Sequence, residues 1–291
     1  MTILKIFAAD IGGTSIKTCI VNDDGVLEEF QEYNPGVQLD GEQVIDIISD
    51  LIAKQDDIDA IGISTTGQVR NGLITYSHKN IRNYTGTKVK EIIEKRFNIP
   101  TIVENDANAA ALGELHYGSG KQFTDFLCLT FGTGIGGAII IDSTLYKGSE
   151  GLAGEIGHMI TRNYDEKNIE HYENIASTTA LVKKSSEIDK EIVNGRILFE
   201  KLKQNNEELE LLLSDWIKEI SIGLVSLIHI FNPSAIILGG GIMEQKKVVD
   251  LISIKVNEML ITSFSNVKII NASLGNRAGL LGVASLHLKN C

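Results

Sequence analysis

The sequence predicts an α/β protein whose two halves repeat one unit: an apolar strand, a glycine-rich turn and a second strand. The first turn is Asp10-Ile-Gly-Gly-Thr14 and the second is Gly132-Thr-Gly-Ile-Gly-Gly137. β-Branched and other apolar residues follow each turn, so each turn is expected at the tip of a β-hairpin. Two matching hairpins in one chain indicate a duplicated fold. The strands that flank the turns are expected at residues 3–9, 18–21, 126–131 and 138–141.

Alternating strands and helices account for the rest of the chain. Val44, Ile48 and Leu51 recur at helical spacing, and Asn232-Pro233 is a typical stop for the longest helix. Gly118-Ser-Gly120 ends the first half, so the domain boundary is expected near residues 118–121. Further strands are expected at 26–33, 59–64, 101–104, 235–238 and 267–270. Helices are expected at 41–54, 87–97, 107–116, 207–231, 245–260 and 277–288, and helices dominate from about residue 173 onward.

The composition favours a soluble, ordered protein with two domain cores, because the 291 residues are 43% hydrophobic and include only 3 prolines. A formal net charge of −11, without a Lys/Arg cluster, argues against a nucleic-acid partner. The N-terminus enters a strand without a basic leader, and no apolar stretch is long enough to span a bilayer. Cys19, Cys128 and Cys291 lie far apart and are expected as reduced thiols, so a cytoplasmic location without a membrane partner is expected.

The glycine turns allow backbone N–H groups to approach a polyanion, and successive N–H groups form an anion-binding concavity. A third cluster, Gly239-Gly-Gly241, follows the strand at 235–238. Gly132, Gly134 and Gly137 also match the dinucleotide-binding pattern G-x-G-x-x-G, but that pattern requires a helix after the turn, and here a strand follows. Three glycine clusters at strand ends therefore favour a polyphosphate ligand over a dinucleotide.

Five motifs occur in order along the chain. They are Asp10-Ile-Gly-Gly-Thr14, Glu104-Asn-Asp-Ala-Asn108, Leu129-Thr-Phe-Gly-Thr-Gly-Ile-Gly-Gly137, Gly154-Glu-Ile-Gly-His158 and Ile237-Leu-Gly-Gly-Gly-Ile242. Their order and spacing resemble the ROK family (repressors, open reading frames, kinases) over essentially the whole chain. The resemblance implies an α/β fold of two ribonuclease-H-like (actin-like ATPase) domains around a nucleotide and sugar cleft. It also implies a homodimer, and domains of residues 1–118 plus 278–291 and 119–277.

Asp106 is the candidate catalytic residue. It lies at a strand-to-helix junction, where a carboxylate can reach a sugar hydroxyl and take its proton. An aspartate before an alanine-rich helix is also an ordinary N-cap, and the residues alone leave that alternative open. The resemblance implies the role of general base, because the family's base is the aspartate of its Asn-Asp pair. It also implies that Asn105 binds sugar hydroxyls.

The glycine turns carry the expected nucleotide-binding residues. Asp10 is expected to face Mg²⁺ through water, because a carboxylate beside phosphates needs an intervening cation; a turn-capping role is the alternative. Lys17 could contact a phosphate, but the alternation of the strand leaves its direction open, and no role is assigned to it. Contacts to ATP are expected from Gly12, Gly13, Thr14, Gly132, Thr133, Gly134, Gly239 and Gly240.

Glu155, His158 and Glu173 are the expected sugar-binding side chains. Glu155 and His158 are three residues apart, so one helical turn would place them on the same side. Glu173 resembles the glutamate that follows the family's metal loop, and a carboxylate suits contacts to adjacent hydroxyls. The alternatives are a solvated glutamate at a helix start and a structural histidine. Gly67 and Asn80 fall where the family approaches the sugar, Asn80 in a looser match.

The sequence departs from the family between His158 and Glu173. Most members carry C-x-C-G-x-x-G-C there and bind Zn²⁺ through three thiolates and the histidine. This chain has no cysteine in residues 159–172, and histidines with scattered carboxylates do not make a closed structural zinc site. No structural zinc is therefore expected. Packing would then have to hold the glutamate in place, through Ile169, Tyr172 and Ile175.

The resemblance implies an ATP- and Mg²⁺-dependent kinase that phosphorylates the 6-hydroxyl of a hexose or N-acetylhexosamine. N-acetylmannosamine and glucose are the expected acceptors, although zinc-less relatives also include glucoside kinases. A sugar-sensing repressor of the family would carry a helix-turn-helix domain before Asp10, where this chain has residues 1–9. A catalytically silent ATP-binding protein would have no need of Asn105 and Asp106. Both remain alternatives to the kinase.

Overall fold

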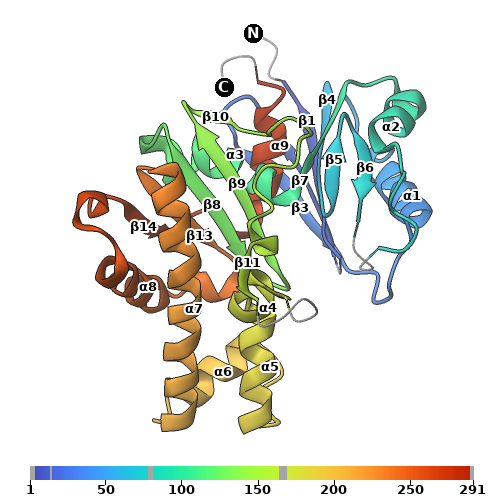
Figure 1. The fold of residues 1–291 in the computed structure, drawn as a ribbon. Coiled ribbons are helices and arrows are strands. Elements are labelled where there is room, and N and C mark those ends of the chain that lie inside the picture. The colour runs from blue at the N-terminus through green and yellow to red at the C-terminus, as the bar shows by residue number, and fades with distance from the viewer. Residues whose placement is uncertain (1–3, 14, 78–80, 164–168, 289–291) are drawn as a thin grey trace. The chain divides into compact units, whose positions relative to one another are not determined.

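The computed structural model describes residues 4–13, 15–77, 81–163 and 169–288, and the chain forms two compact units (Figure 1). Each unit contains a five-stranded sheet with helices. Unit 1 includes a stretch, Leu145–Ala153, whose neighbours on both sides along the chain belong to unit 2. Unit 1 comprises Met1–Lys121, Leu145–Ala153 and Asn276–Cys291, and unit 2 comprises Gln122–Thr144 and Gly154–Gly275.

The sheet of unit 1 has the strand order β3-β2-β1-β4-β7. β1 pairs antiparallel with β2, and β2 with β3, whereas β4 and β7 extend the sheet in parallel with β1. The carboxyl ends of β1, β4 and β7 therefore meet at one edge, where Asp10, Thr65 and Asn105 lie. The strands are β1 (Ile6–Ile11), β2 (Ile16–Val21), β3 (Leu27–Tyr33), β4 (Ala60–Thr65) and β7 (Thr101–Asn105).

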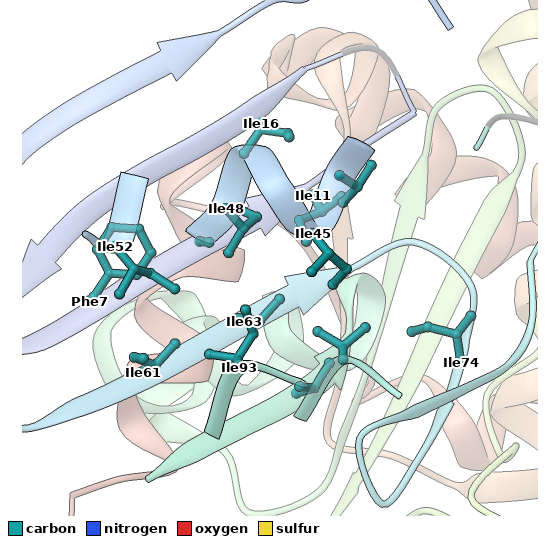
Figure 2. Packing of buried hydrophobic residues seen from close by; sticks show 14 of the residues in the cluster. Phe7, Ile11, Ile16, Ile45, Ile48, Ile52, Ile61, Ile63, Ile74 and Ile93 are labelled. Atoms are coloured by element: carbon teal, nitrogen blue, oxygen red, sulfur yellow. The ribbon is translucent and has the colours of Figure 1, made fainter. Parts of the chain in front are cut away.

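One face of this sheet packs on α1 (Gly41–Ile52) and α2 (Val89–Phe97) through a core made largely of isoleucine (Figure 2). A capping box between Asp40 and Gln43 starts α1, and the helical spacing of its apolar residues turns them towards the strands. A short hairpin, β5 (Gln68–Arg70) and β6 (Leu73–Tyr76), lies between β4 and α2 in the chain. The labelled core residues are Phe7, Ile11, Ile16, Ile45, Ile48, Ile52, Ile61, Ile63, Ile74 and Ile93.

The opposite face is covered by α9 (Ala278–Ser285), which packs against α3 (Asp106–Tyr117). Because side chains alternate along β4, Ile61 and Ile63 enter the core while Gly62 faces the backbone of Val283 in α9. The two helices approach so closely at Gly282 that a Cβ there would collide with the carbonyl oxygen of Ala109. This close contact fixes the start of α3 relative to the sheet.

Unit 2 repeats this arrangement in the strand order β10-β9-β8-β13-β14. β8 pairs antiparallel with β9 and parallel with β13, and β13 pairs parallel with β14. The strands are β8 (Phe126–Phe131), β9 (Ile135–Ile141), β10 (Thr144–Leu145), β13 (Ala235–Gly239) and β14 (Lys268–Asn271), with a separate hairpin of β11 (Ile160–Asn163) and β12 (Ile169–His171). Leu145, the second residue of β10, is counted with unit 1. The helices are α4 (Tyr172–Ala176), α5 (Thr178–Ile188), α6 (Gly195–Leu202), α7 (Glu207–Phe231) and α8 (Lys246–Met259).

The predicted duplicated α/β fold is confirmed, because both sheets place a central strand between an antiparallel and a parallel neighbour. The hairpins β5–β6 and β11–β12 were not predicted, because their strands are too short to show an alternating pattern. Within the described part of the chain, no helix has the length and apolar character needed to cross a membrane.

Candidate functional site

Asp10 lies near the carboxyl end of β1, beside the first glycine turn. Its Oδ1 accepts a hydrogen bond of 2.6 Å from Ser64 Oγ, because β1 and β4 run parallel with these residues in register. Burial raises the pKa of the Asp10 carboxyl, while the Ser64 hydrogen bond and the charge of Lys17 oppose that shift. Lys17 Nζ donates to Asn276 Oδ1 at 3.1 Å. Asp10 is therefore a partly buried carboxylate at the edge where the parallel strands end.

One backbone N–H group of the first glycine turn is already hydrogen-bonded within the turn. Gly12 N donates to the carbonyl oxygen of Ser15 at 3.0 Å, so a phosphate contact at Gly12 would have to replace that bond. Gly13 is half-buried. Thr14, the last predicted ATP contact of this turn, lies outside the described residues. So does Asn80 of the predicted sugar site.

Asp106 is the first residue of α3, directly after β7. The helix is capped by Asn105, whose Oδ1 accepts from the backbone N of Ala107 at 3.0 Å and of Asn108 at 3.1 Å. Asp106 is therefore not the N-cap residue that the sequence left as an alternative. Its Oδ1 accepts 2.9 Å hydrogen bonds from Ala107 N and Asn105 Nδ2.

The Asp106 carboxyl reaches solvent, but protein crowds it on its other sides. This desolvation, followed by the negative charge of Asp10, raises the pKa of Asp106 to about 7, and its hydrogen bonds oppose the shift without cancelling it. Because two carboxyl groups at the same sheet edge repel each other, one of them holds a proton more strongly than an ordinary aspartate. Such a carboxyl can change its protonation state near neutral pH.

Asn105 also connects Gly67, another predicted sugar contact, to Asp106. Its Nδ2 donates to the carbonyl oxygen of Gly67 at 3.0 Å as well as to Asp106. Gly67 has a φ of 94°, and a Cβ there would lie 2.7 Å from the carbonyl oxygen of Tyr76, so the position suits glycine. The structure thus assembles Asp10, Gly67, Asn105 and Asp106 within unit 1.

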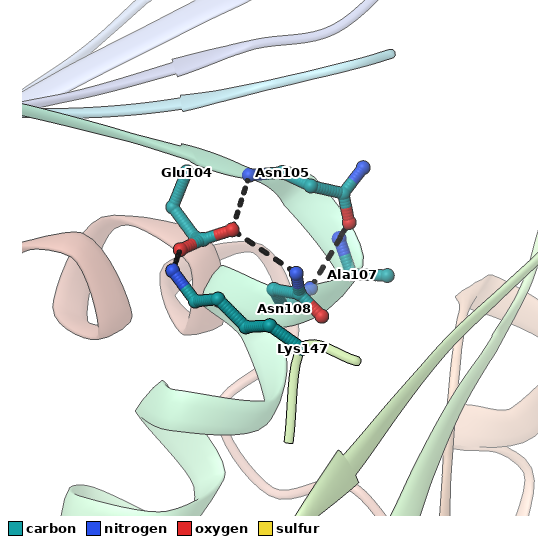
Figure 3. Close-up of polar contacts among 5 residues, drawn as sticks. All are labelled: Glu104, Asn105, Ala107, Asn108 and Lys147. Atoms are coloured by element: carbon teal, nitrogen blue, oxygen red, sulfur yellow. Dashed lines mark hydrogen bonds and ion pairs between the residues drawn. The ribbon is translucent and has the colours of Figure 1, made fainter. Parts of the chain in front are cut away.

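Glu104 and Lys147 form an ion pair that the sequence did not single out (Figure 3). The buried Glu104 carboxylate accepts hydrogen bonds from Asn105 N and from Asn108 Nδ2, as well as from Lys147 Nζ. Glu104 stands within a recognised motif, which could have drawn attention to it. Lys147 belongs to a loop whose packing on unit 1 has no local sequence pattern.

In unit 2 the second glycine turn joins β8 to β9, at the tip of the predicted hairpin. Gly132 N donates to the carbonyl oxygen of Gly134 at 2.9 Å, and Gly132 O accepts from Thr179 N at 3.2 Å. Gly240 has a φ of 102°, and a Cβ there would collide with the carbonyl oxygen of Phe131. The structure therefore brings Gly239 and Gly240 beside the turn that contains Gly132, Thr133 and Gly134.

Glu173 connects the glycine turn to the other predicted sugar residues of unit 2. Its Oε2 accepts a hydrogen bond of 3.3 Å from Ile135 N. The same oxygen lies 3.0 Å from the position of a Cβ at Gly157, and a Cβ at Gly134 would collide with it. The glutamate therefore fills space that two glycines leave open, rather than lying on a solvated helix face.

Glu155 and His158 lie at a 3₁₀ turn, where His158 Nε2 is 3.9 Å from Glu155 Oε2. The imidazole rings of His158 and His171 meet edge to face at 5.8 Å, and His171 Nδ1 is 3.0 Å from the carbonyl oxygen of His158. Tyr172 is fully buried, and the next residue is Glu173. Ile169, expected to pack beneath the glutamate, is instead 45% exposed; it is the first residue of β12, which pairs with β11 in a two-stranded sheet.

Among the described residues, no group of three or more His, Cys, Asp or Glu side chains is placed to hold a metal ion. The carboxylate oxygens of Asp10 and Asp106 are nevertheless donors of the kind that Mg²⁺ prefers when phosphates and water complete its coordination. Residues 164–168, in the segment where the family carries its zinc loop, lie outside the described part of the chain. Absence of a structural zinc stays a prediction.

Comparison with known proteins gives consistent matches along the chain. The model of the ROK family matches residues 6–290. A β-glucoside kinase of Listeria monocytogenes is 32% identical, over 98% of this chain and 98% of that protein. A proposed N-acetylmannosamine kinase from Listeria monocytogenes has a similar structure, with a TM-score of 0.89 and 30% identity over 99% of each chain. A ROK family glucokinase from Streptomyces griseus, solved with glucose and AMPPNP, gives a TM-score of 0.85 and 29% identity over 97% of this chain and 98% of that one.

Proposed function

The chain belongs to the ROK family, and from that premise we propose that it transfers the γ-phosphoryl group of ATP to the 6-hydroxyl of a hexose or N-acetylhexosamine. Kinase activity on a sugar is supported by relatives that cover 97% or more of the chain and are themselves named as sugar kinases. The single observation that carries the proposal is the Asp106 carboxyl, oriented by Asn105 at the start of α3 and with a pKa raised to about 7.

Asp106 is the proposed general base. A base works best when its pKa lies near the working pH, because it is then ionised and still a good proton acceptor. In this role Asp106 accepts the proton of the sugar's primary hydroxyl as that oxygen attacks the γ-phosphorus, and the oxygen–phosphorus bond to ADP breaks. Asn105 holds the carboxylate in one orientation through its Nδ2. Gly67 and Asn105 are the proposed sugar contacts in unit 1.

Contacts to ATP are proposed for Gly12 and Gly13 of the unit 1 turn and for residues 132–134 of the unit 2 turn. Asp10 would hold Mg²⁺ through water, and the bound ion would neutralise the phosphate charges during transfer. Gly239 and Gly240 already lie beside the unit 2 turn, which suits a nucleotide site that uses both segments.

Glu155, His158 and Glu173 are the proposed sugar contacts in unit 2. One carboxylate oxygen of Glu173 accepts a hydrogen bond from Ile135 N. A sugar hydroxyl would therefore donate either to that same oxygen or to the other one. N-acetylmannosamine and glucose remain the proposed acceptors. A β-glucoside is the second candidate, because a relative 32% identical over nearly the full length is named a β-glucoside kinase.

An acceptor panel tests the proposal. ADP release is measured with glucose, N-acetylmannosamine and an aryl β-glucoside, and the position of the new phosphate is read by NMR. We expect Asp106→Asn to lower kcat about 10²–10⁴-fold while the KM values for sugar and ATP stay near wild type. Asp24→Asn, an exposed residue of the same unit, serves as the matched control. Retention of more than about a tenth of wild-type turnover by Asp106→Asn would exclude Asp106 as the base.

The same panel addresses the alternatives within the family. A sugar-sensing regulator would bind a sugar without releasing ADP, and a silent ATP-binding protein would bind ATP without turnover on any acceptor. Binding of each ligand, measured by calorimetry beside the turnover assay, distinguishes these outcomes from a kinase whose acceptor is missing from the panel.

A further inference from the structure

Glu104 is a buried carboxylate one residue before Asn105 (Figure 3). Its side chain is 4% exposed. Oε1 accepts from Asn105 N at 3.1 Å and from Asn108 Nδ2 at 3.0 Å, and Oε2 accepts from Lys147 Nζ at 2.5 Å. A buried charge is tolerated only when it is paired and hydrogen-bonded. Lys147 supplies the compensating charge in this pair.

A short series of contacts leads from this ion pair to the proposed base. Glu104 fixes the backbone N–H of Asn105 and the side chain of Asn108, which together form the junction between β7 and α3. The Asn105 side chain caps α3 and donates its two Nδ2 hydrogen bonds to Gly67 O and Asp106 Oδ1. The orientation of the Asp106 carboxylate therefore depends on Asn105, and the placement of Asn105 depends on Glu104.

Lys147 reaches this junction from the loop 145–153, which belongs to unit 1 although unit 2 residues flank it in the chain. A hydrogen bond of 3.1 Å from Ala153 N to Lys147 O closes the loop. A second ion pair, Arg70–Glu150 at 2.5 Å, also joins it to unit 1, but those side chains are 55% and 60% exposed. Exposed pairs contribute little to stability. The Lys147 side chain is itself 50% exposed, so the two ion pairs of the loop differ in their carboxylates, because Glu104 is 4% exposed and Glu150 is 60% exposed.

We propose that Lys147 is a positioning residue for phosphoryl transfer, an inference that rests on the proposed kinase function. Its ammonium group compensates Glu104, and Glu104 in turn holds Asn105 and thereby the carboxylate of Asp106. Without the ammonium group, the buried carboxylate must admit water or rotate away from its two donors. Either change loosens the Asn105–Asp106 junction, while the glycine turns that are proposed to hold ATP stay as they are.

The test compares Lys147→Met with Arg70→Met, because each removes one ion pair between the same loop and the rest of unit 1. We expect Lys147→Met to lower kcat about 10- to 100-fold, the scale of loss caused by a small misplacement of a catalytic group. Its KM for ATP should stay at the wild-type value. Arg70→Met should match wild type in both constants, and Lys147→Arg should recover most of the lost kcat. Thermal unfolding of each variant is measured in parallel.

A paired variant keeps the inference testable if Lys147→Met does not fold. Glu104→Gln combined with Lys147→Met removes both charges, and the amide oxygen introduced at position 104 can still accept from Asn105 and Asn108. We expect the kcat of the double variant to exceed that of Lys147→Met. If Lys147→Met is unfolded, the kcat of the double variant should equal that of Glu104→Gln alone.

Three results would overturn the inference: a folded Lys147→Met enzyme with wild-type kcat, an equal loss in Arg70→Met, or losses that simply add in the double variant. Its failure is distinct from failure of the proposed function. A wild-type protein without turnover on any sugar contradicts the kinase proposal, whereas an active wild type with an unimpaired Lys147→Met variant contradicts only the role of Lys147.

Discussion

Replacing Tyr172 by phenylalanine removes one hydroxyl from the buried contact between α4 and α7. Tyr172 is fully buried, and its hydroxyl donates to the carbonyl oxygen of Ile220 at 2.8 Å. The ring lies against Gly223, where a Cβ would come within 2.8 Å of the Tyr172 hydroxyl oxygen and closer to the ring carbons. Glu173 directly follows Tyr172 in the chain, so this contact sets the position of the proposed sugar-binding glutamate.

The size of the effect follows from what the substitution removes. The ring stays, so no cavity larger than a hydroxyl forms, and the loss is one buried hydrogen bond worth about 0.5–1.5 kcal/mol. A loss of about 1 kcal/mol in a chain of this size lowers the apparent Tm by about 2–4 °C. If the whole of that free energy passed to sugar binding through Glu173, the sugar KM would rise about fivefold for a loss of about 1 kcal/mol, and at most about 12-fold for about 1.5 kcal/mol.

Gly223→Ala tests the same contact from the other side. Glycine to alanine inside a helix normally stabilises by about 1 kcal/mol. Here the added methyl group would overlap the Tyr172 ring, so we expect the opposite sign, a destabilisation of about 1–3 kcal/mol. The sugar KM should rise with it, because Tyr172 and Glu173 both belong to α4, and a displaced ring would shift that helix.

Thermal unfolding and sugar kinetics are measured together for both variants, with Tyr84→Phe as the matched control. Tyr84 is a buried tyrosine of unit 1, with its hydroxyl 2.9 Å from Thr65 Oγ1, so its loss should lower the Tm without raising the sugar KM. The reasoning is refuted if Tyr172→Phe leaves the Tm unchanged, or if the sugar KM responds equally to Tyr172→Phe and Tyr84→Phe.

Two further predictions concern protons and metal. With the pKa of Asp106 raised to about 7, kcat/KM should fall as pH drops below 7, because the base becomes protonated. The effect of Asp106 on the stability of the fold has the opposite sign. Its pKa in the folded state lies above the unfolded value of 3.8, so the stability of the fold that is present below pH 3.8 is lost as pH rises through 7. Asp106→Asn should therefore raise the Tm relative to wild type more at pH 8 than at pH 5. Elemental analysis of the purified protein should find far less than one zinc per chain, and a stoichiometric zinc lost together with the fold on chelation would contradict the interpretation of residues 159–172.

The sequence predicted those parts of the site that depend on neighbouring residues. The hairpin at Gly132 is encoded by glycines between apolar runs, and the junction at Asn105 and Asp106 by a strand followed by alanines. Helical spacing located α1 and α7. These features depend on backbone preference and on the period of apolar residues, both of which act over a few residues. They are therefore visible without knowledge of the fold.

Contacts between residues far apart in the chain were decided only by the tertiary structure. Glu104 accepts from the backbone N of Asn105 at the start of α3, and its charge partner is Lys147, 43 residues away. The hydroxyl of Tyr172 bonds to α7, 48 residues further on, and Glu173 meets the turn at Ile135 across 38 residues. No local pattern encodes such pairs, because each becomes favourable only after the sheets and helices have buried both partners together.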